Sequence, residues 1–293
     1  MSKVLDDIKK RASLLGKHIV LPEGEDKRVV QAAADSVKEG IAKITLLGNE
    51  EEIRKNNPEV DLTGVTIVDP IKCDKFEQYA ELLYELRKEK GMTIELARET
   101  LKKDYTMFGA LMLKADDVDG MVSGACHSTA NTLRPALQIL KTAPGTKLVS
   151  AFFVMCTDTP QFGTDGTLIF ADCGLNINPS SDELSEIAIA SAHSWSTFMG
   201  NVEPHVAMLS YSTMGSAGGE VAKKVQEAVK FCKEKAPELA IDGDLQLDAA
   251  IVPTVAQLKA PGSSVAGKAN VLVFPDLEAG NIGYKLVQRF AGA

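Results

Sequence analysis

The sequence is poor in the side chains that most often build metal and disulfide sites. Its 293 residues include four histidines and five cysteines, and no two cysteines have the C-x-x-C spacing. An odd number of scattered cysteines is typical of a reduced protein without structural disulfides or a zinc site. We therefore expect no bound metal and a cytoplasmic location.

The sequence also lacks long apolar runs and a net positive charge. No stretch approaches the roughly 18 apolar residues of a transmembrane helix, and residues 1–17 predict an amphipathic helix rather than a signal peptide. The formal net charge of −8 argues against nucleic acid or an anionic membrane as the main partner. An anionic substrate stays open, because a few local arginines can set the field inside a cleft.

What the sequence contains is a regular alternation of short apolar runs with longer amphipathic ones. The short runs predict strands at residues 18–23, 42–48, 65–70, 118–124, 147–156, 166–172, 205–211 and 269–276. The longer runs predict helices at residues 26–40, 49–56, 75–91, 132–142, 181–200, 218–236 and 279–293. This alternation predicts an α/β fold with largely parallel sheets that helices cover on both faces.

Local signals mark where some of these elements begin and end. Ser180 or Ser181 is expected to cap the helix at 181–200. Pro135 is expected in the first turn of its helix, where its missing N–H costs little. Pro144 and Gly145 interrupt the alternation and mark a domain boundary. Since a chain of this length usually forms two domains, we expect α/β domains at residues 1–145 and 146–293.

Four polar, glycine-rich turns are the candidate anion-binding elements. They span residues 123–134, 209–220, 260–270 and 274–285. In parallel α/β folds, ligands bind where strands end and the chain turns into the next helix. Backbone N–H groups and hydroxyls in such turns can converge on an anion. The four turns together favour a phosphate ligand.

One of these turns imitates a P-loop. Gly262 to Lys268 fit the pattern G-x-x-x-x-G-K, but the next residue is Ala269 where a P-loop has Ser or Thr for Mg²⁺. The turn also leads into an apolar strand instead of a helix whose N-terminus would face the phosphates. The spacing therefore does not predict a P-loop nucleotide hydrolase.

Four basic side chains, three in these turns and one in a predicted helix, have both a functional and a structural interpretation. Arg134 lies between a Ser/Thr/Asn-rich turn and an apolar helix, where it can face an anion or simply be solvated. A solvated position is the default interpretation for Arg87, near the end of a charged helix. Lys268 and Lys285 share this ambiguity.

Nucleophiles and carboxylates in the turns are weaker candidates. Cys126 and His127 are adjacent, but no third group orients them, so loop packing is the favoured interpretation. Asp165, Asp172 and Asp276 lie near strand ends and could bind Mg²⁺ or act as bases, yet acidic residues are common at turns. These residues alone predict an enzyme or binder of small phosphorylated molecules.

Longer segments resemble the phosphate acetyl/butyryltransferase family. The resemblance rests on VLPEGEDKR, YELRKEKG, VDGMVSGACHSTANTLRPALQILKT, SYSTMGSAGGE, DGDLQLDAAIVP and APGSSVAGKANVLVFPDLEAGNIGYKLVQR. These segments span essentially the whole chain, and the last is highly specific to the family. The resemblance implies an acyltransferase that moves an acetyl group between acetyl phosphate and coenzyme A. It also implies two three-layer α/β domains with a cleft between them, a homodimer, and no tightly bound cofactor or metal.

The resemblance also implies which residues bind the anionic substrates. The matching arginines are Arg28, Arg87, Arg134 and Arg289, and guanidinium groups suit this task because they stay charged and fit phosphate bidentately. Ser128, Thr129 and the turn with Lys268 are expected to line the same cleft. The implied mechanism is direct attack of the coenzyme A thiolate on the acetyl carbonyl. A carboxylate would take the thiol proton, with no covalent enzyme intermediate.

The sequence departs from the family pattern after Arg289. Family members continue with a segment containing N-D-L-S-R-G and then an Asp, whose Ser, Arg and Asp are the catalytic set and which completes the first domain. No such motif occurs up to Ala293. The catalytic residues are therefore unassigned. We expect a truncated chain or part of a longer protein, with impaired catalysis and an exposed apolar surface.

Three other functions stay open. A phosphate butyryltransferase would differ only in the volume of its acyl pocket. One or two methylenes change the binding free energy of a substrate by only a few kcal/mol. An NAD(P)-dependent hydroxyacid dehydrogenase has little support, because no G-x-G-x-x-G follows a predicted strand. A catalytically inactive binding or assembly module is the third alternative.

Overall fold

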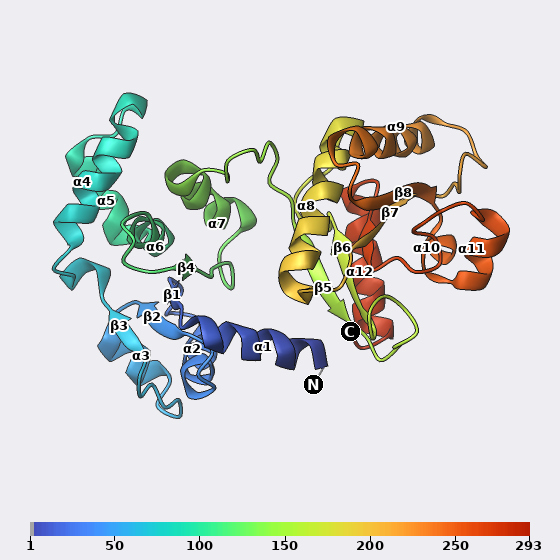
Figure 1. Ribbon diagram of the computed structural model, residues 1–293. Coiled ribbons are helices and arrows are strands. Elements are labelled where there is room, and N and C mark those ends of the chain that lie inside the picture. The colour runs from blue at the N-terminus through green and yellow to red at the C-terminus, as the bar shows by residue number, and fades with distance from the viewer. Residues whose placement is uncertain (1–2) are drawn as a thin grey trace. The chain divides into compact units, whose positions relative to one another are not determined.

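The computed structural model describes residues 3–293, and the chain divides into two compact units. The N-terminal unit comprises residues Leu5–Ala143, and the C-terminal unit comprises residues Pro144–Ala293 together with Lys3 and Val4. In Figure 1 the N-terminal unit runs from blue to green, and the C-terminal unit runs from green through yellow to red. Each unit has its own sheet and its own helices.

The sheet of the N-terminal unit has four parallel strands in the order β3-β2-β1-β4. These strands are β1 (His18–Leu21), β2 (Lys43–Leu47), β3 (Thr66–Val68) and β4 (Gly120–Met121). The helices are α1 (Lys3–Leu15), α2 (Lys27–Lys38), α3 (Glu50–Asn56), α4 (Phe76–Arg87), α5 (Ile94–Lys103), α6 (Tyr105–Lys114) and α7 (Thr129–Pro135). Short 3₁₀ turns cover Pro70–Lys72 and Lys88–Lys90, and a π-helix covers Ala136–Leu140.

Successive strand residues face opposite sides of this sheet, which places helices on both faces. Val20 and Leu47 join the cluster built by α4, α5 and α6. Leu21 and Leu46 join the cluster built by α2 and α3. All four side chains are buried, so the period of two along each strand fills two apolar layers. The unit therefore has three layers.

The sheet of the C-terminal unit has five strands in the order β5-β6-β9-β7-β8. These are β5 (Phe152–Cys156), β6 (Thr167–Ala171), β7 (His205–Leu209), β8 (Ala240–Leu245) and β9 (Val271–Val273). Only the edge pair of β5 with β6 is antiparallel. The helices are α8 (Ser181–Met199), α9 (Glu220–Lys235), α10 (Leu247–Ile251), α11 (Pro253–Lys259) and α12 (Leu277–Phe290).

The C-terminal unit also has three layers. Ile169 and Met208 pack on the face covered by α8 and α9. Phe170 and Leu209 pack on the opposite face, against α10 and α12. The predicted fold class, α/β with largely parallel sheets, is confirmed. Within residues 3–293 no helix is long and apolar enough to cross a membrane.

Several elements differ from the sequence-based predictions. β8 was not predicted, because its sequence AIDGDL breaks the apolar pattern with two aspartates and a glycine; Asp244 is nevertheless 1% exposed. Helices α5 and α6 fall in a stretch without a prediction. Pro135 was expected in the first turn of its helix, and this was wrong. The helix begins at Thr129, so Pro135 is its seventh and last residue, followed by the π-helix.

The N-terminal cap of α8 follows the prediction. Ser180 accepts a hydrogen bond from the Glu183 backbone N–H at 3.3 Å, and the Glu183 carboxylate accepts one from the Ser180 backbone N–H at 2.8 Å. This reciprocal pair satisfies two donors that the first turn leaves unpaired. Of the two predicted caps, Ser180 is therefore the correct one.

Candidate active site

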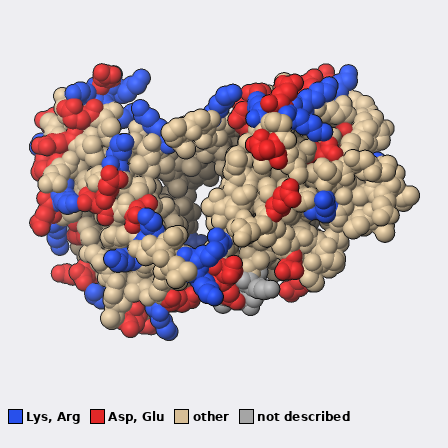
Figure 2. Space-filling view, in the orientation of Figure 1, with Lys and Arg blue, Asp and Glu red and all other residues tan. Residues whose placement is uncertain are grey.

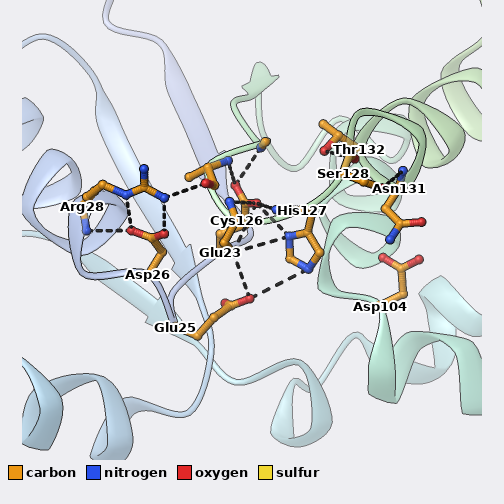
Figure 3. A network of polar contacts seen from close by, with 12 residues as sticks. Glu23, Glu25, Asp26, Arg28, Asp104, Cys126, His127, Ser128, Asn131 and Thr132 are labelled. Atoms are coloured by element: carbon orange, nitrogen blue, oxygen red, sulfur yellow. Dashed lines mark hydrogen bonds and ion pairs between the residues drawn. The ribbon is translucent and has the colours of Figure 1, made fainter.

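Strand order brings two of the predicted site segments together in the N-terminal unit. β1 and β4 are hydrogen-bonded neighbours and run parallel. The segments that follow them, residues 22–28 and 122–128, therefore leave the sheet at the same edge. Figure 3 shows the resulting network of polar contacts.

The centre of this network is the carboxylate of Glu23, which is 1% exposed. Its Oε2 accepts hydrogen bonds from the backbone N–H groups of Gly124 at 2.7 Å and Ala125 at 2.9 Å. Its Oε1 accepts from the backbone N–H groups of Cys126 at 3.0 Å and His127 at 3.2 Å. His127 Nδ1 adds a fifth contact, 2.7 Å from Oε1. Four consecutive backbone donors thus converge on one carboxylate.

These contacts determine the charge states of Glu23 and His127. Burial opposes ionisation of Glu23, but the hydrogen bonds from Ala125, Cys126 and His127 outweigh it and hold the pKa of Glu23 far below its ordinary value. The hydrogen bond to Glu23 raises the pKa of His127, against a smaller opposing effect of burial. Glu23 is therefore an anion at every working pH, and it favours the protonated form of His127.

Cys126 lies between two carboxylates. Its Sγ is 3.5 Å from Glu23 Oε1 and 3.5 Å from Glu25 Oε1. Desolvation and the charge of Glu25 raise the pKa of the Cys126 thiol to about 12. Since the thiolate is the nucleophilic form, the raised pKa leaves little of the reactive form of Cys126 at neutral pH. This agrees with the interpretation that Cys126 and His127 serve loop packing.

The same three residues are also the one cluster of potential metal ligands that residues 3–293 hold. Glu23, Cys126 and His127 each place a donor atom within 4.8 Å of the others. Glu23 Oε1 and His127 Nδ1 bond to each other, so these atoms form part of the hydrogen-bond network around Glu23.

Arg28 joins this network from the start of α2. Its Nε and Nη2 donate to the carboxylate of Asp26 at 3.0 and 2.6 Å, and Nη2 also donates to the Ala125 carbonyl oxygen at 2.6 Å. The Asp26 carboxylate in turn accepts from the Arg28 backbone N–H as the cap of α2. With 73% of its side chain exposed, Arg28 is held at one edge and open to solvent at the other.

Ser128, Thr129 and Arg134 follow the 124–127 segment in helix α7. Ser128 Oγ accepts from the Asn131 backbone N–H at 3.3 Å and caps the helix. Thr129 is the first helical residue, and both hydroxyl-bearing residues are exposed. Arg134 donates to the Asn131 side-chain oxygen and is also exposed. The structure thus brings Arg28, Ser128 and Thr129 to one edge of the sheet, with Arg134 further along α7.

The other predicted site residues lie elsewhere. Arg87 is the last residue of α4 and is partly buried, and its carbonyl oxygen accepts a hydrogen bond from the Met92 backbone N–H. Arg289 is exposed near the end of α12 in the C-terminal unit. Lys268, also in that unit, is exposed and lines a 350 Å³ cavity beside Pro253 and Ser263.

The turn with Lys268 differs from the other three predicted turns. Residues 123–134, 209–220 and 274–285 follow β4, β7 and β9, whereas residues 260–270 precede β9. Lys268 therefore approaches the amino end of β9, and Asp276 follows its carboxyl end. Asp276 accepts from the Ala279 backbone N–H at 2.9 Å and caps α12.

The sequence did not predict that carboxylates of the protein itself accept hydrogen bonds from backbone N–H groups of the loops. Asp172, 3% exposed, accepts backbone N–H groups from Gly174 at 2.8 Å and Leu175 at 2.9 Å. Asp244 accepts the backbone N–H of Gly215 at 3.0 Å. Glu23 and Asp244 thus satisfy N–H groups of turns that were predicted to converge on a ligand, whereas the donors to Asp172 lie outside the four predicted turns. The available signal was weak: Glu23 and Asp172 are the last residues of two predicted strands.

Comparison with known proteins identifies the family. Residues 3–293 match the profile described as "Phosphate acetyl/butaryl transferase". The chain belongs to this family. A phosphate acetyltransferase of Acetivibrio thermocellus is 60% identical over 289 residues, covering 99% of this chain and 86% of the relative. A phosphate acetyltransferase of Thermoanaerobacterium thermosaccharolyticum is 53% identical over 290 residues, covering 99% of this chain and 88% of the relative.

Solved structures of the phosphate acetyl/butyryltransferase family agree in fold. A phosphotransacetylase from Streptococcus pyogenes superposes with a TM-score of 0.89 at 42% sequence identity. The match covers 99% of this chain and 87% of that one. The family resemblance predicted from the sequence motifs is confirmed, and the protein is an enzyme.

Proposed function

We propose that this member of the phosphate acetyl/butyryltransferase family transfers an acetyl group between acetyl phosphate and coenzyme A. The observation that carries the proposal is similarity over nearly the whole chain to phosphate acetyltransferases at 53–60% identity. These relatives favour acetyl over butyryl transfer. They also favour an active acyltransferase over a dehydrogenase or an inactive binding module.

The exposed basic side chains supply the binding groups. We propose that Arg28 and Arg134 bind substrate phosphates together with the Ser128 and Thr129 hydroxyls, and that Arg87 at the end of α4 is a further binding group. Arg28 and Arg134 present guanidinium groups to solvent, and such groups bind phosphate bidentately. Arg289 and Lys268 would add charge from the second domain. The proposed domains are residues 1–145 and 146–293.

The chemistry we propose is direct transfer without an acyl-enzyme. The coenzyme A thiolate attacks the acetyl carbonyl carbon, a C–S bond forms, and the bond from that carbon to the phosphate oxygen breaks. Phosphate leaves, and a carboxylate takes the thiol proton. The raised pKa of Cys126 supports this route, because it removes the reactive form of the cysteine nearest to Ser128. The catalytic carboxylate itself is unassigned.

We also propose a cytoplasmic homodimer without a tightly bound cofactor. All five cysteines are free, which supports a reducing compartment. Three apolar side chains at intervals of four residues on α12 support a protein interface, since Ile282 is 59% exposed, Leu286 50% and Phe290 88%. Basic and acidic side chains are interspersed on the face shown in Figure 2, which supports small-molecule substrates over nucleic acid or membrane.

The test is thioester formation from acetyl phosphate and coenzyme A by the purified chain, followed by the absorbance of the thioester bond. Butyryl phosphate serves as the matched second substrate. The expected result is phosphate release and thioester formation with a higher kcat/KM for acetyl phosphate. A preference for butyryl phosphate would replace the acetyl assignment, and absence of turnover with either acyl phosphate would refute the proposed function.

A further inference from the structure

The backbone segment 124–127 has the form of an anion-binding nest, but its anion is part of the protein. Consecutive N–H groups that point to one side form a concavity that binds phosphate in many enzymes. Here the concavity is filled by the Glu23 carboxylate, which lies 101 to 104 residues away in the sequence. The same N–H groups cannot bind a substrate phosphate while Glu23 holds them.

Because Glu23 occupies the backbone N–H groups of residues 124–127, side chains must bind the substrate at this place instead. The two residues on either side of the nest are linked to it directly. Arg28 donates to the Ala125 carbonyl oxygen at 2.6 Å, and Ser128 follows His127 in the chain. Any movement of residues 124–127 therefore moves both the anchor of Arg28 and the start of α7. Figure 3 shows Glu23 between these two groups.

We propose that Glu23 is a positioning residue, whose buried carboxylate fixes residues 124–127 and thereby holds Arg28, Ser128 and Thr129 in place to bind the anionic substrates. Glu23 touches no substrate in this proposal. It acts as a permanent internal anion that gives the segment one conformation before the substrate arrives, which lowers the ordering cost of binding. The kinetic part of the inference rests on the proposed acetyl transfer.

The carboxylate cannot be replaced by its amide without loss. Oε2 accepts two backbone N–H groups, and Oε1 accepts two more together with His127 Nδ1. A glutamine at position 23 would keep one acceptor oxygen and turn an NH₂ group toward the other pair of donors. That pair would lose its acceptor inside a buried site, and the negative charge would be lost as well.

The experiment compares Glu23→Gln with wild type in steady-state kinetics for both substrates. We expect the KM for coenzyme A or acetyl phosphate to rise by about tenfold or more, with kcat within about threefold of wild type. A merely structural role would reduce the fraction of folded enzyme, which lowers the apparent kcat and leaves KM unchanged. Both KM values within about twofold of wild type would overturn the proposal.

Two further variants separate positioning from other effects. Glu59→Gln makes the same chemical change at an exposed site of the same unit and should leave both KM values unchanged. His127→Asn removes one of the five contacts and keeps the Glu23 charge, so it should raise the same KM by a smaller factor, about threefold. If Glu23→Gln does not fold, His127→Asn decides the question, and an unchanged KM in that variant would overturn the proposal.

A readout without turnover distinguishes failure of this inference from failure of the proposed function. Hydrogen exchange of the amides of residues 124–127 should be slow in wild type and in Glu59→Gln. It should be at least tenfold faster in Glu23→Gln or His127→Asn. Equal exchange in all variants would refute the role of Glu23 even in an active enzyme. Faster exchange in an enzyme that forms no thioester would refute the acetyl transfer alone and keep Glu23 as the residue that orders this segment.

Discussion

The guanidinium of Arg28 donates a hydrogen bond to the carbonyl oxygen of Ala125 at 2.6 Å, and so joins segments 97 residues apart in the chain. The same guanidinium also bonds to both carboxylate oxygens of Asp26. A planar fork with five N–H donors can make these contacts at once and still face solvent. The contacts with Asp26 and Ala125 therefore fix the orientation of the Arg28 guanidinium, and its other edge is exposed to solvent. An arginine that binds phosphate requires both.

Replacement of Arg28 by lysine should impair substrate binding and leave the fold intact. A lysine ammonium cannot span Asp26 and Ala125 while presenting a bidentate face, so the KM of the substrate bound there should rise by about tenfold. The side chain is 73% exposed, so the free energy of unfolding should stay close to that of wild type. Steady-state kinetics and urea unfolding check both expectations.

Arg54→Lys is the matched control for this change. Arg54 is exposed in α3 and pairs with Glu50 on the same helix. Its replacement should change neither KM. Equal KM values for wild type and Arg28→Lys would show that Arg28 does not contact a substrate.

Cys126 should be unreactive toward alkylating reagents at neutral pH despite its exposed position. Its pKa of about 12 keeps the thiol protonated, so iodoacetamide should modify it at least about a hundredfold more slowly than an ordinary exposed thiol. Glu25→Gln removes one of the carboxylates 3.5 Å from the sulfur and should speed the reaction. Mass spectrometry of the alkylated peptide measures both rates.

The activity of Cys126→Ser distinguishes packing from catalysis. Direct transfer predicts a kcat within about threefold of wild type, because no bond to the Cys126 sulfur forms in the reaction. Loss of activity in this variant with an unchanged fold would contradict the direct mechanism and point to an acyl-enzyme.

His127 should stabilise the protein more at low pH than at high pH. Its pKa is raised in the folded state, mainly by the hydrogen bond to Glu23 and further by the charges of Glu25 and Asp104. A group with a raised folded pKa contributes its full stabilisation below its unfolded pKa, about 6.5, and loses it as the pH rises through the folded value. The 37% exposure of His127 keeps the effect small.

The measurement is the difference in unfolding free energy between wild type and His127→Gln across this pH range. We expect the difference to be largest below about pH 6.5 and to decline above it. A difference that grows with pH would reverse the assigned sign and contradict the pairing with Glu23.

Asp172→Asn should destabilise the C-terminal unit. The Asp172 carboxylate is 3% exposed and accepts backbone N–H groups from Ala151, Gly174, Leu175 and Asn176. An asparagine would leave part of this set unpaired in a buried site, at a cost of about 2 to 3 kcal/mol. Denaturant unfolding measures the change, with the exposed Asp158→Asn as the matched control. Equal stability of the two variants would show that the loop donors find other acceptors.

Local patterns in the sequence determined the fold class and the family. The alternation of short apolar runs with amphipathic ones predicted strands and helices at most of the observed positions, because periods of two and of about 3.6 residues reflect which faces are buried. The cap at Ser180 followed from local hydrogen bonding, which needs only neighbours in the chain. The motif segments indicated the family for the same reason. Each motif is a contiguous stretch of sequence, so it can be recognised without knowing which residues it contacts in the folded protein.

The tertiary structure decided what depends on distant contacts. β8 carries Asp242 and Asp244 in a buried strand, and the α9 residues Lys233 and Gln226 pair with these two carboxylates. The glycine-rich segment after β4 was predicted to bind a ligand anion, but its N–H groups bind Glu23, because β1 and β4 pair in parallel and end at the same edge. Whether a turn binds a substrate or an internal carboxylate depends on which strand lies beside it, and strand order is a property of the folded chain.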